Sequence, residues 1–129
     1  MTLDTDVLIE ISRGRSEAIP FLKSLDSPTL RISGIVAMEF LIGSRDKHQQ
    51  AQSQKILSKC EIIALSPRDS LLAVTLVEEF GLRSGLSLPD YLIAAQALNN
   101  FEVLYSFNIK HFSIIPGLDV WAPYERADR

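Results

Sequence analysis

Short apolar runs alternate along the chain with segments whose apolar positions recur at helical spacing. This pattern predicts strands at about residues 2–5, 30–33, 61–65, 103–106 and 118–121. It predicts helices at about residues 7–14, 16–25, 35–42, 46–59, 66–80 and 89–98. Strands separated by helices are typical of a parallel sheet that helices cover on both faces.

Turn and capping signals support several of these boundaries. Ser33 is a candidate N-cap for the third helix, and Gly43 lies just past its end. Ser66 and Pro67 are expected to open the fifth helix. No repeat, linker or shift in composition divides residues 1–129, so we expect a single domain.

Composition narrows the class of protein. Hydrophobic residues make up 47% of the chain and charged residues 22%, which argues against disorder. No apolar run is long enough to span a bilayer, Asp4 and Asp6 interrupt any signal peptide, and Cys60 has no disulfide partner. We therefore expect a cytoplasmic protein without membrane contact. With a net charge of −3, any binding of nucleic acid must rely on local basic clusters or on a second subunit.

Two acids stand in the apolar stretch LDTDVLI near the N-terminus. A parallel sheet binds its ligands beyond the carboxyl ends of its strands, where both acids are expected. Asp6 is placed to cap a helix starting at Val7, a role we favour over a metal contact. Asp4 has no helix start of its own to cap, which favours a functional role.

Glu39 shares a helical face with the apolar side chains of Ile35 and Ile42. No lysine or arginine lies within a helical turn of it. The pattern indicates an inward-facing acid, either at a site or in an ion pair with a distant arginine such as Arg31 or Arg83.

Asp90 falls in the first turn of the most apolar helix, where the helix dipole alone would favour an acid. Its face continues with small alanines, which let another element approach closely. Asp4, Glu39 and Asp90 could then converge from three segments. Their mutual repulsion would be relieved by a hard divalent ion, Mg²⁺ or Mn²⁺.

Four motifs in series resemble the PIN domain family, and specifically the VapC-type toxins of bacterial toxin–antitoxin pairs. They are LDTDVLI, SGIVAMEFLIG, LPDYLIAAQA and YSFNIKHFSIIPGLDVWAP. The resemblance implies a PIN-like three-layer α/β/α fold with a four- or five-stranded parallel sheet. It also implies an Mg²⁺-dependent endoribonuclease, a toxin that forms a homodimer and, with its cognate antitoxin, a larger complex in which the antitoxin tail occupies the site.

The same resemblance implies site residues. Asp4, Glu39 and Asp90 would hold the magnesium ion, and Asp6 is a further candidate ligand. In the last motif, many relatives carry threonine, a basic residue and then aspartate or asparagine. This chain has Ser106, Phe107 and Asn108, so a fourth carboxylate and a basic phosphate contact are both missing.

The remaining polar residues of the last motif have narrower expected roles. Ser106 is a candidate to orient a bound water, and Asn108 to supply a neutral oxygen or a hydrogen bond. His111 is expected in a loop, either at the site or at the surface.

Metal-assisted phosphodiester hydrolysis is the chemistry that these residues favour. The candidates for gripping an RNA backbone, each of which is equally well explained as a plain surface residue, are Arg13, Arg15, Arg45, Lys47 and Lys110.

Other classes fit less well. A haloacid-dehalogenase-type phosphatase would use Asp4 as nucleophile and Asp6 as acid/base, but it needs a later acidic pair that is missing here. A response-regulator receiver needs a phospho-accepting aspartate after its third strand, where this chain reads IIALSP. A catalytically decayed PIN module, acting as a binding or scaffold protein, is favoured by Asn108 and disfavoured by the three acids.

Overall fold

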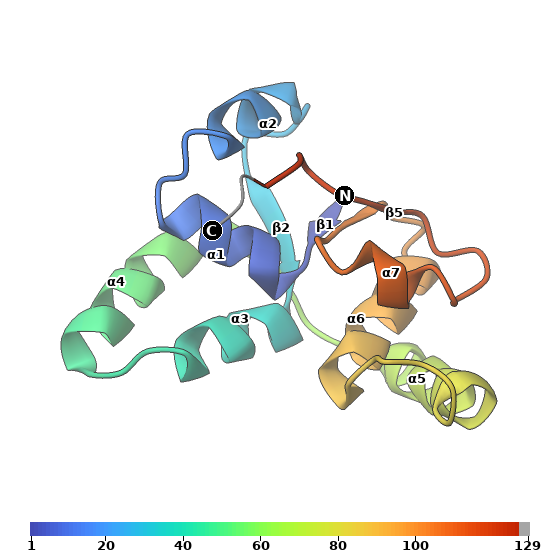
Figure 1. Cartoon of the computed structure of the whole chain (residues 1–129). Coiled ribbons are helices and arrows are strands. Elements are labelled where there is room, and N and C mark those ends of the chain that lie inside the picture. The colour runs from blue at the N-terminus through green and yellow to red at the C-terminus, as the bar shows by residue number, and fades with distance from the viewer. Residues whose placement is uncertain (127–129) are drawn as a thin grey trace.

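A five-stranded parallel sheet forms the centre of residues 1–126, the part of the chain that this computed structural model describes (Figure 1). The strands are β1 (Thr2–Leu3), β2 (Leu30–Ser33), β3 (Cys60–Ile63), β4 (Leu104–Tyr105) and β5 (Val120–Trp121). The helices are α1 (Thr5–Ser12), α2 (Ala18–Ser24), α3 (Gly34–Ile42), α4 (Lys47–Leu57), α5 (Pro67–Phe80), α6 (Leu88–Asn99) and α7 (Ile109–Phe112).

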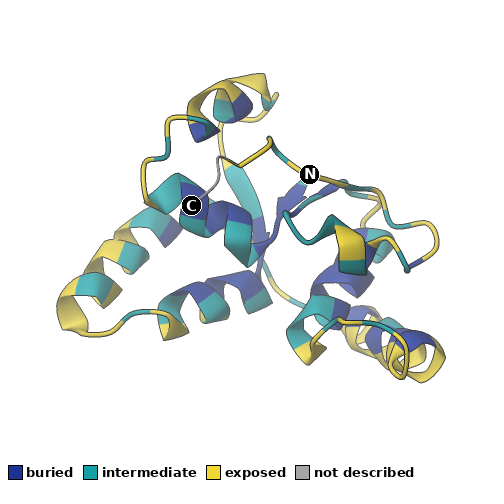
Figure 2. Ribbon diagram, viewed as in Figure 1, coloured by how far each residue is buried: buried dark blue, intermediate teal, exposed yellow. Residues whose placement is uncertain are grey.

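Helices cover both faces of the sheet, which confirms the expected α/β/α fold. The strand order is β3-β2-β1-β4-β5, and α1 to α4 lie on one side of it while α5 and α6 lie on the other (Figure 1). The connections from β1 to β3 and the return from β3 to β4 run in opposite directions, so right-handed crossovers place their helices on opposite faces. Leu3, Ile32 and Leu104 on the three central strands are completely buried (Figure 2).

The strand order reverses between β1 and β4, because the chain first builds the sheet on one side of β1 and then returns to the other. Open parallel sheets bind their ligands at the carboxyl ends of the strands that flank such a switch point. Asp4 follows β1 directly, and Ser106 follows β4. The backbone N–H of Asp4 donates to the carbonyl of Tyr105 at 2.9 Å, which ties the two strand ends together.

The capping pattern is partly as predicted. Ser33 caps α3, accepting from the Ile35 N–H at 3.2 Å, and Gly43 follows its last turn. The expectation for the first helix is wrong. That helix begins at Thr5, so Asp4 is its N-cap and Asp6 lies inside its first turn. The cause is the short first strand, which ends at Leu3 and leaves Asp4 as the only residue between strand and helix.

The sequence pattern missed α7, a helix of four residues within the last motif. A single turn is too short to show helical periodicity. Phe112 is completely buried and anchors this turn to the core. His111, expected in a loop, therefore lies on α7. Elsewhere, no helix among the described residues is both long enough and apolar enough to cross a membrane.

Gln96 connects α6 to the end of β3. Its side-chain Nε2 donates to the carbonyls of Ile63 and Ala64 at 3.2 and 3.0 Å, and the residue is 5% exposed. Removing the buried amide would break two hydrogen bonds at once and costs free energy to the extent that water does not replace them.

Replacing this amide tests the connection. We expect Gln96→Met, which keeps the length of the side chain, to lower the free energy of unfolding by about 1–3 kcal/mol. Urea denaturation followed by circular dichroism measures the change. Gln54→Met, on the exposed face of α4, is the matched control and should stay within about 0.5 kcal/mol of wild type. Equal effects of the two substitutions would contradict the anchoring role.

Candidate active site

Asp4 is the most tightly held acid of the switch point. It is 6% exposed, and its Oδ1 accepts from the Thr5 N–H at 2.8 Å. Its Oδ2 accepts from the hydroxyl of Ser106 at 2.7 Å. Ser106 is completely buried, and its Oγ accepts in turn from the Asn108 N–H at 2.9 Å. The turns after β1 and β4 thus fix the orientation of one carboxylate.

The charge of this carboxylate is poorly stabilised. Burial is the main cause that raises the pKa of Asp4 to about 7, and the neighbouring charge of Asp6 adds to it. The hydrogen bonds from Ser106 and Thr5 lower the pKa but do not offset burial, and Asp90 raises it further. An ionised Asp4 therefore favours any cation that reaches it.

Asp6 belongs to the same acidic cluster. Its Oδ2 accepts from the Phe107 N–H at 3.1 Å, so it reaches the chain beyond β4. Its Oδ1 is buried and has no hydrogen-bond partner within residues 1–126. The pKa of Asp6 is raised, mainly by burial, and the charge of Asp90 adds to this. The charge of Arg126 acts in the opposite direction and lowers it.

Glu39 reaches the site through one hydrogen bond. It is half-buried on α3, and its Oε1 accepts from the Thr5 hydroxyl at 2.7 Å. Thr5 directly follows Asp4, so both acids are attached to the same turn. Sequence reasoning gave no role to Thr5, whose place between the two aspartates of the first motif was its only signal.

The two arginines considered as partners for Glu39 are engaged elsewhere. The guanidinium of Arg31 binds Glu102 at 2.6 Å and Glu61 at 3.0 Å. Arg83 lies over the ring of Phe80, 5.1 Å from its centroid.

Asp90 occupies the first turn of α6, as its sequence position predicted, and is half-buried. Its Oδ2 accepts from both the N–H and the hydroxyl of Ser87 at 2.9 Å. Its charge also raises the pKa of Asp4 and of Asp6. Asp90 therefore closes the capping box at the start of α6 and adds negative charge to the acidic cluster.

The side chain of Asn108 turns to its own helix, with Oδ1 2.7 Å from His111 Nδ1. Within residues 1–126, no three His, Cys, Asp or Glu side chains are grouped tightly enough to hold a metal ion as they stand. Asp4, Asp6 and Asp90 are coupled by charge, and Glu39 joins them through Thr5.

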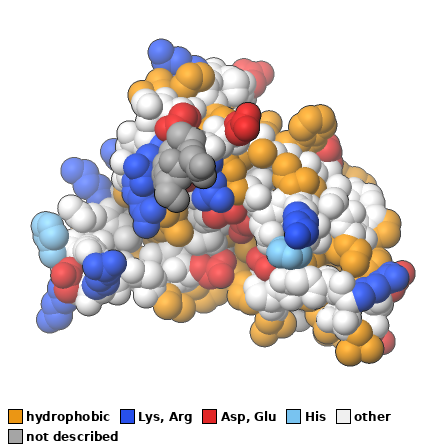
Figure 3. Space-filling model, in the orientation of Figure 1, with side chains coloured by type: hydrophobic (Ala, Val, Ile, Leu, Met, Phe, Trp, Pro, Cys, Tyr) orange, Lys and Arg blue, Asp and Glu red, His pale blue; other side chains and the backbone are white. Residues whose placement is uncertain are grey.

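A groove of about 700 Å³ extends from Glu39 between α1, α3 and α4. Arg13, Arg45 and Lys55 are among the residues that line it. Figure 3 shows Lys and Arg side chains on the left of this face, over α1 and α4, and Asp and Glu side chains nearer the centre.

The other residues predicted to contact an RNA backbone do not line this groove. Arg15 forms an ion pair with the buried Glu10 at 3.7 Å. Lys47 and Lys110 are exposed at the surface and do not line the groove.

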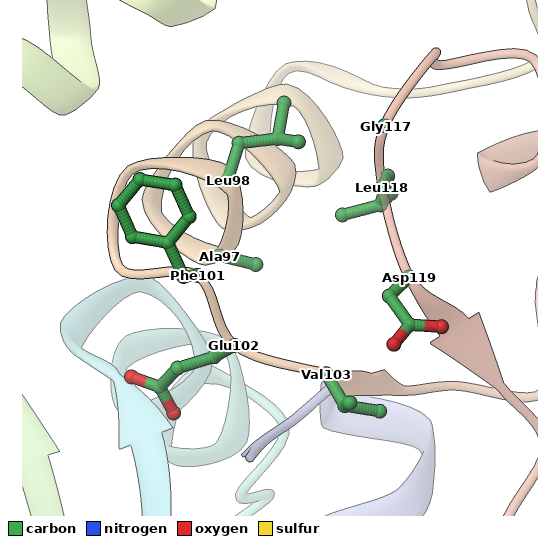
Figure 4. A pocket seen from close by; sticks show the side chains of 8 residues that line it. All are labelled: Ala97, Leu98, Phe101, Glu102, Val103, Gly117, Leu118 and Asp119. Carbon is green, nitrogen blue, oxygen red and sulfur yellow. The ribbon is translucent and has the colours of Figure 1, made fainter.

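A second hollow, of about 310 Å³, lies at the opposite edge of the sheet (Figure 4). Glu102 and Asp119, which line it, precede β4 and β5, so it opens at the amino ends of the strands. Glu102 is held there by Arg31 and by the N-terminal amino group, at 2.6 and 3.1 Å. The sequence places no candidate site residue there.

The PIN domain model matches residues 1–116, so the chain belongs to the PIN domain family, whose members are generally nucleases. Among solved structures, a chain of a toxin–antitoxin complex from Klebsiella pneumoniae is 35% identical with a TM-score of 0.79, over 98% of this chain and 100% of that one. VapBC2 from Rickettsia felis, bound to a DNA fragment from its promoter, is 27% identical with a TM-score of 0.82, over 94% and 96%. A search of curated proteins found no match.

The raised pKa of Asp4 predicts how stability depends on pH. The folded protein keeps this proton up to about pH 7, whereas the unfolded chain releases it near 3.8. Between these values the folded state binds more protons, so in EDTA the free energy of unfolding should fall as the pH rises. Asp4→Asn keeps a capping side chain and should remove most of that fall.

Urea denaturation between pH 4.5 and 8 measures this dependence. Asp46→Asn, at the exposed N-cap of α4, is the matched control and should keep the wild-type profile. A profile of Asp4→Asn parallel to wild type would show that Asp4 titrates normally in the folded protein.

Proposed function

We propose that this protein is an Mg²⁺-dependent endoribonuclease, the toxin of a VapBC-type pair, inhibited by a cognate antitoxin. The observation that carries the proposal is the buried Asp4 carboxylate, whose pKa of about 7 reflects burial and the neighbouring acids at the switch point of a PIN fold. The 35% identical chain from a Klebsiella pneumoniae toxin–antitoxin complex supports the toxin role.

The donor set suits a hard divalent cation. Asp4, Glu39 and Asp90 offer carboxylate oxygens, the ligands that Mg²⁺ and Mn²⁺ prefer. Asp6 would add an oxygen that is buried without a hydrogen-bond partner among the described residues. When bound, such an ion supplies positive charge to the scissile phosphate and lowers the pKa of the attacking water.

The chain's own residues hold the acids in place. Ser106 donates to Asp4 while accepting from the Asn108 N–H, and it is completely buried. These contacts favour a positioning role for Ser106 over direct contact with a water. Thr5 orients Glu39 in the same way, and Ser87 orients Asp90. Asn108 contributes through its backbone, because its amide oxygen faces His111.

RNA is the proposed substrate, and the groove beside Glu39 supports it. Arg13, Arg45 and Lys55 place positive charge along the groove that Glu39 also lines. Such side chains neutralise phosphates, which accounts for nucleic-acid binding by a protein of net charge −3. We expect the cognate antitoxin to abolish cleavage when it is added in equimolar amount.

Removing individual acids tests the catalytic assignment. Asp4→Asn, Glu39→Gln and Asp90→Asn should each lower the rate of RNA cleavage at least about a hundredfold, because each removes a charge that holds the ion. The assay uses a fluorescently labelled RNA with Mg²⁺, and EDTA should stop the wild-type reaction. Glu79→Gln, an exposed acid of α5, is the matched control and should keep wild-type activity.

Two outcomes would change this assignment. If a folded wild type gave no product with Mg²⁺ or Mn²⁺, a non-catalytic PIN module would be the better description. If DNA of the same sequence were cut faster than RNA, the substrate class would be wrong.

We also propose a homodimer. Leu71 and Val74 lie one turn apart on α5 and are 69% and 54% exposed, and Leu82, just beyond this helix, is fully exposed. Apolar side chains that gather on one exposed surface mark interaction sites, and a second copy of the chain would cover them.

Negative charges introduced on this surface should dissociate the dimer. We expect sedimentation velocity to show a dimer for wild type and a monomer for Leu71→Asp/Val74→Asp, because burying two carboxylates in an apolar interface costs more than the contact contributes. Ile19→Asp alters a comparably exposed apolar residue, 51% accessible and on α2 at the other face of the sheet, and should leave the dimer intact. A wild-type monomer at micromolar concentration would contradict the proposal.

A further inference from the structure

Position 107 lies at the acidic site but carries no charge. The Phe107 N–H donates to Asp6 Oδ2 at 3.1 Å, so this residue adjoins the cluster formed with Asp4 and Asp90. The ring of Phe107 itself offers a phosphate no positive charge at this position.

The chain beyond β5 returns to this position. Tyr124 packs edge-on against the ring of Phe107, with centroids 5.2 Å apart. Two residues later, the guanidinium of Arg126 lies over the same ring, with Cζ 4.2 Å from the centroid. A positive charge from the C-terminal segment therefore lies beside the ring of Phe107.

About half of the Arg126 side chain is open to a ligand, since it is 47% exposed. Its Nη1 forms an ion pair with Glu10 Oε1 at 3.8 Å, which is longer than a hydrogen bond. The buried Glu10 also forms an ion pair with Arg15, so Arg126 is not the only cation that balances its charge. The positive charge lies next to the acids, because the ring that the guanidinium covers belongs to Phe107, whose N–H donates to Asp6 Oδ2.

An arginine in this setting is well suited to a phosphate. The planar guanidinium binds phosphate oxygens in pairs, and stacking on an aromatic ring restricts its motion without using its N–H donors. Lysine would keep the charge but lose much of the stacking and the paired geometry.

We propose that Arg126, stacked on the ring of Phe107 beside the acids, binds a phosphate group of RNA at the candidate site. The proposal rests on the proposed nuclease function, since it assumes that RNA enters this site. It assigns the C-terminal segment to substrate binding, beyond the four motifs that define the catalytic acids.

Binding of RNA without metal tests the proposal separately from catalysis. The probe is a fluorescein-labelled single-stranded RNA, titrated with full-length protein in EDTA at several salt concentrations. We expect Arg126→Gln to weaken binding about tenfold and to reduce the slope of log K against log salt by about 0.7, the value for one lost phosphate contact. Arg126→Lys should keep most of that slope with intermediate affinity.

Arg68→Gln is the matched control, because it removes the same charge from an exposed position on α5. It should bind RNA as wild type does, and equal melting temperatures would show that all variants fold. In the cleavage assay, Arg126→Gln should raise KM and leave kcat within about twofold.

Three results would overturn the proposal. They are wild-type affinity in Arg126→Gln, a loss of affinity equal to that of Arg68→Gln, and no binding of the RNA by wild type in EDTA. Faster cleavage by Arg126→Gln would instead make Arg126 a cover over the acids. If wild type bound RNA through Arg126 yet cut nothing, the proposed activity would fail while this inference stood.

Discussion

The burial of Asp4 between two strand ends is the constraint on which the rest of the structure depends. A second buried aspartate shows the contrast. Asp69, 3% exposed, is fully engaged in structure, because it accepts from the Ser66 N–H and from the Asn99 amide at 2.8 Å each. Asp4 is bonded as well, but it also faces two further acids, and its pKa of about 7 shows that the hydrogen bonds do not compensate. Asp69 stabilises the fold, whereas Asp4 is held in a state that a cation would stabilise.

The helix starts around the switch point explain how the protein can fold with these acids uncompensated. Asp4 caps α1, and Asp90 lies in the first turn of α6, so each carboxylate is next to the positive end of a helix dipole. Each dipole offsets part of the repulsion, though not all of it, since the pKa of Asp4 remains raised. The backbone N–H groups at a helix start, which create the positive end of its dipole, also favour an incoming phosphate. One local arrangement thus stabilises the acids in the fold and, under the proposed function, would also favour a cation and an anionic substrate.

Sequence reasoning reached the fold because the relevant signals are local. Alternating strands and helices, and the caps at Ser33 and Ser66, are visible within a few residues of each position. The sequence pattern assigned the N-cap of the first helix to Asp6, whereas Asp4 is the cap. The end of the first strand decides which acid becomes the cap, and a strand of two residues is too short to show periodicity. The partner of Glu39 was missed for a different reason: Thr5 is 34 residues away, and only the packing of α1 on α3 brings the two together.

The availability of positive charge at the site also depends on packing, which the local sequence pattern does not show. The sequence shows thirteen lysines and arginines but not which of them remain available. Arg31 and Arg15 form ion pairs with acids of the fold. Arg13, just after α1, and Arg45, just before α4, line one groove because both helices pack on α3. A chain of negative net charge therefore presents positive charge in the groove that Glu39 lines, and that local charge is what a polyanion would encounter there. The ring at position 107 fits this picture, because the guanidinium of Arg126 stacks on it and adds a positive charge beside Asp6.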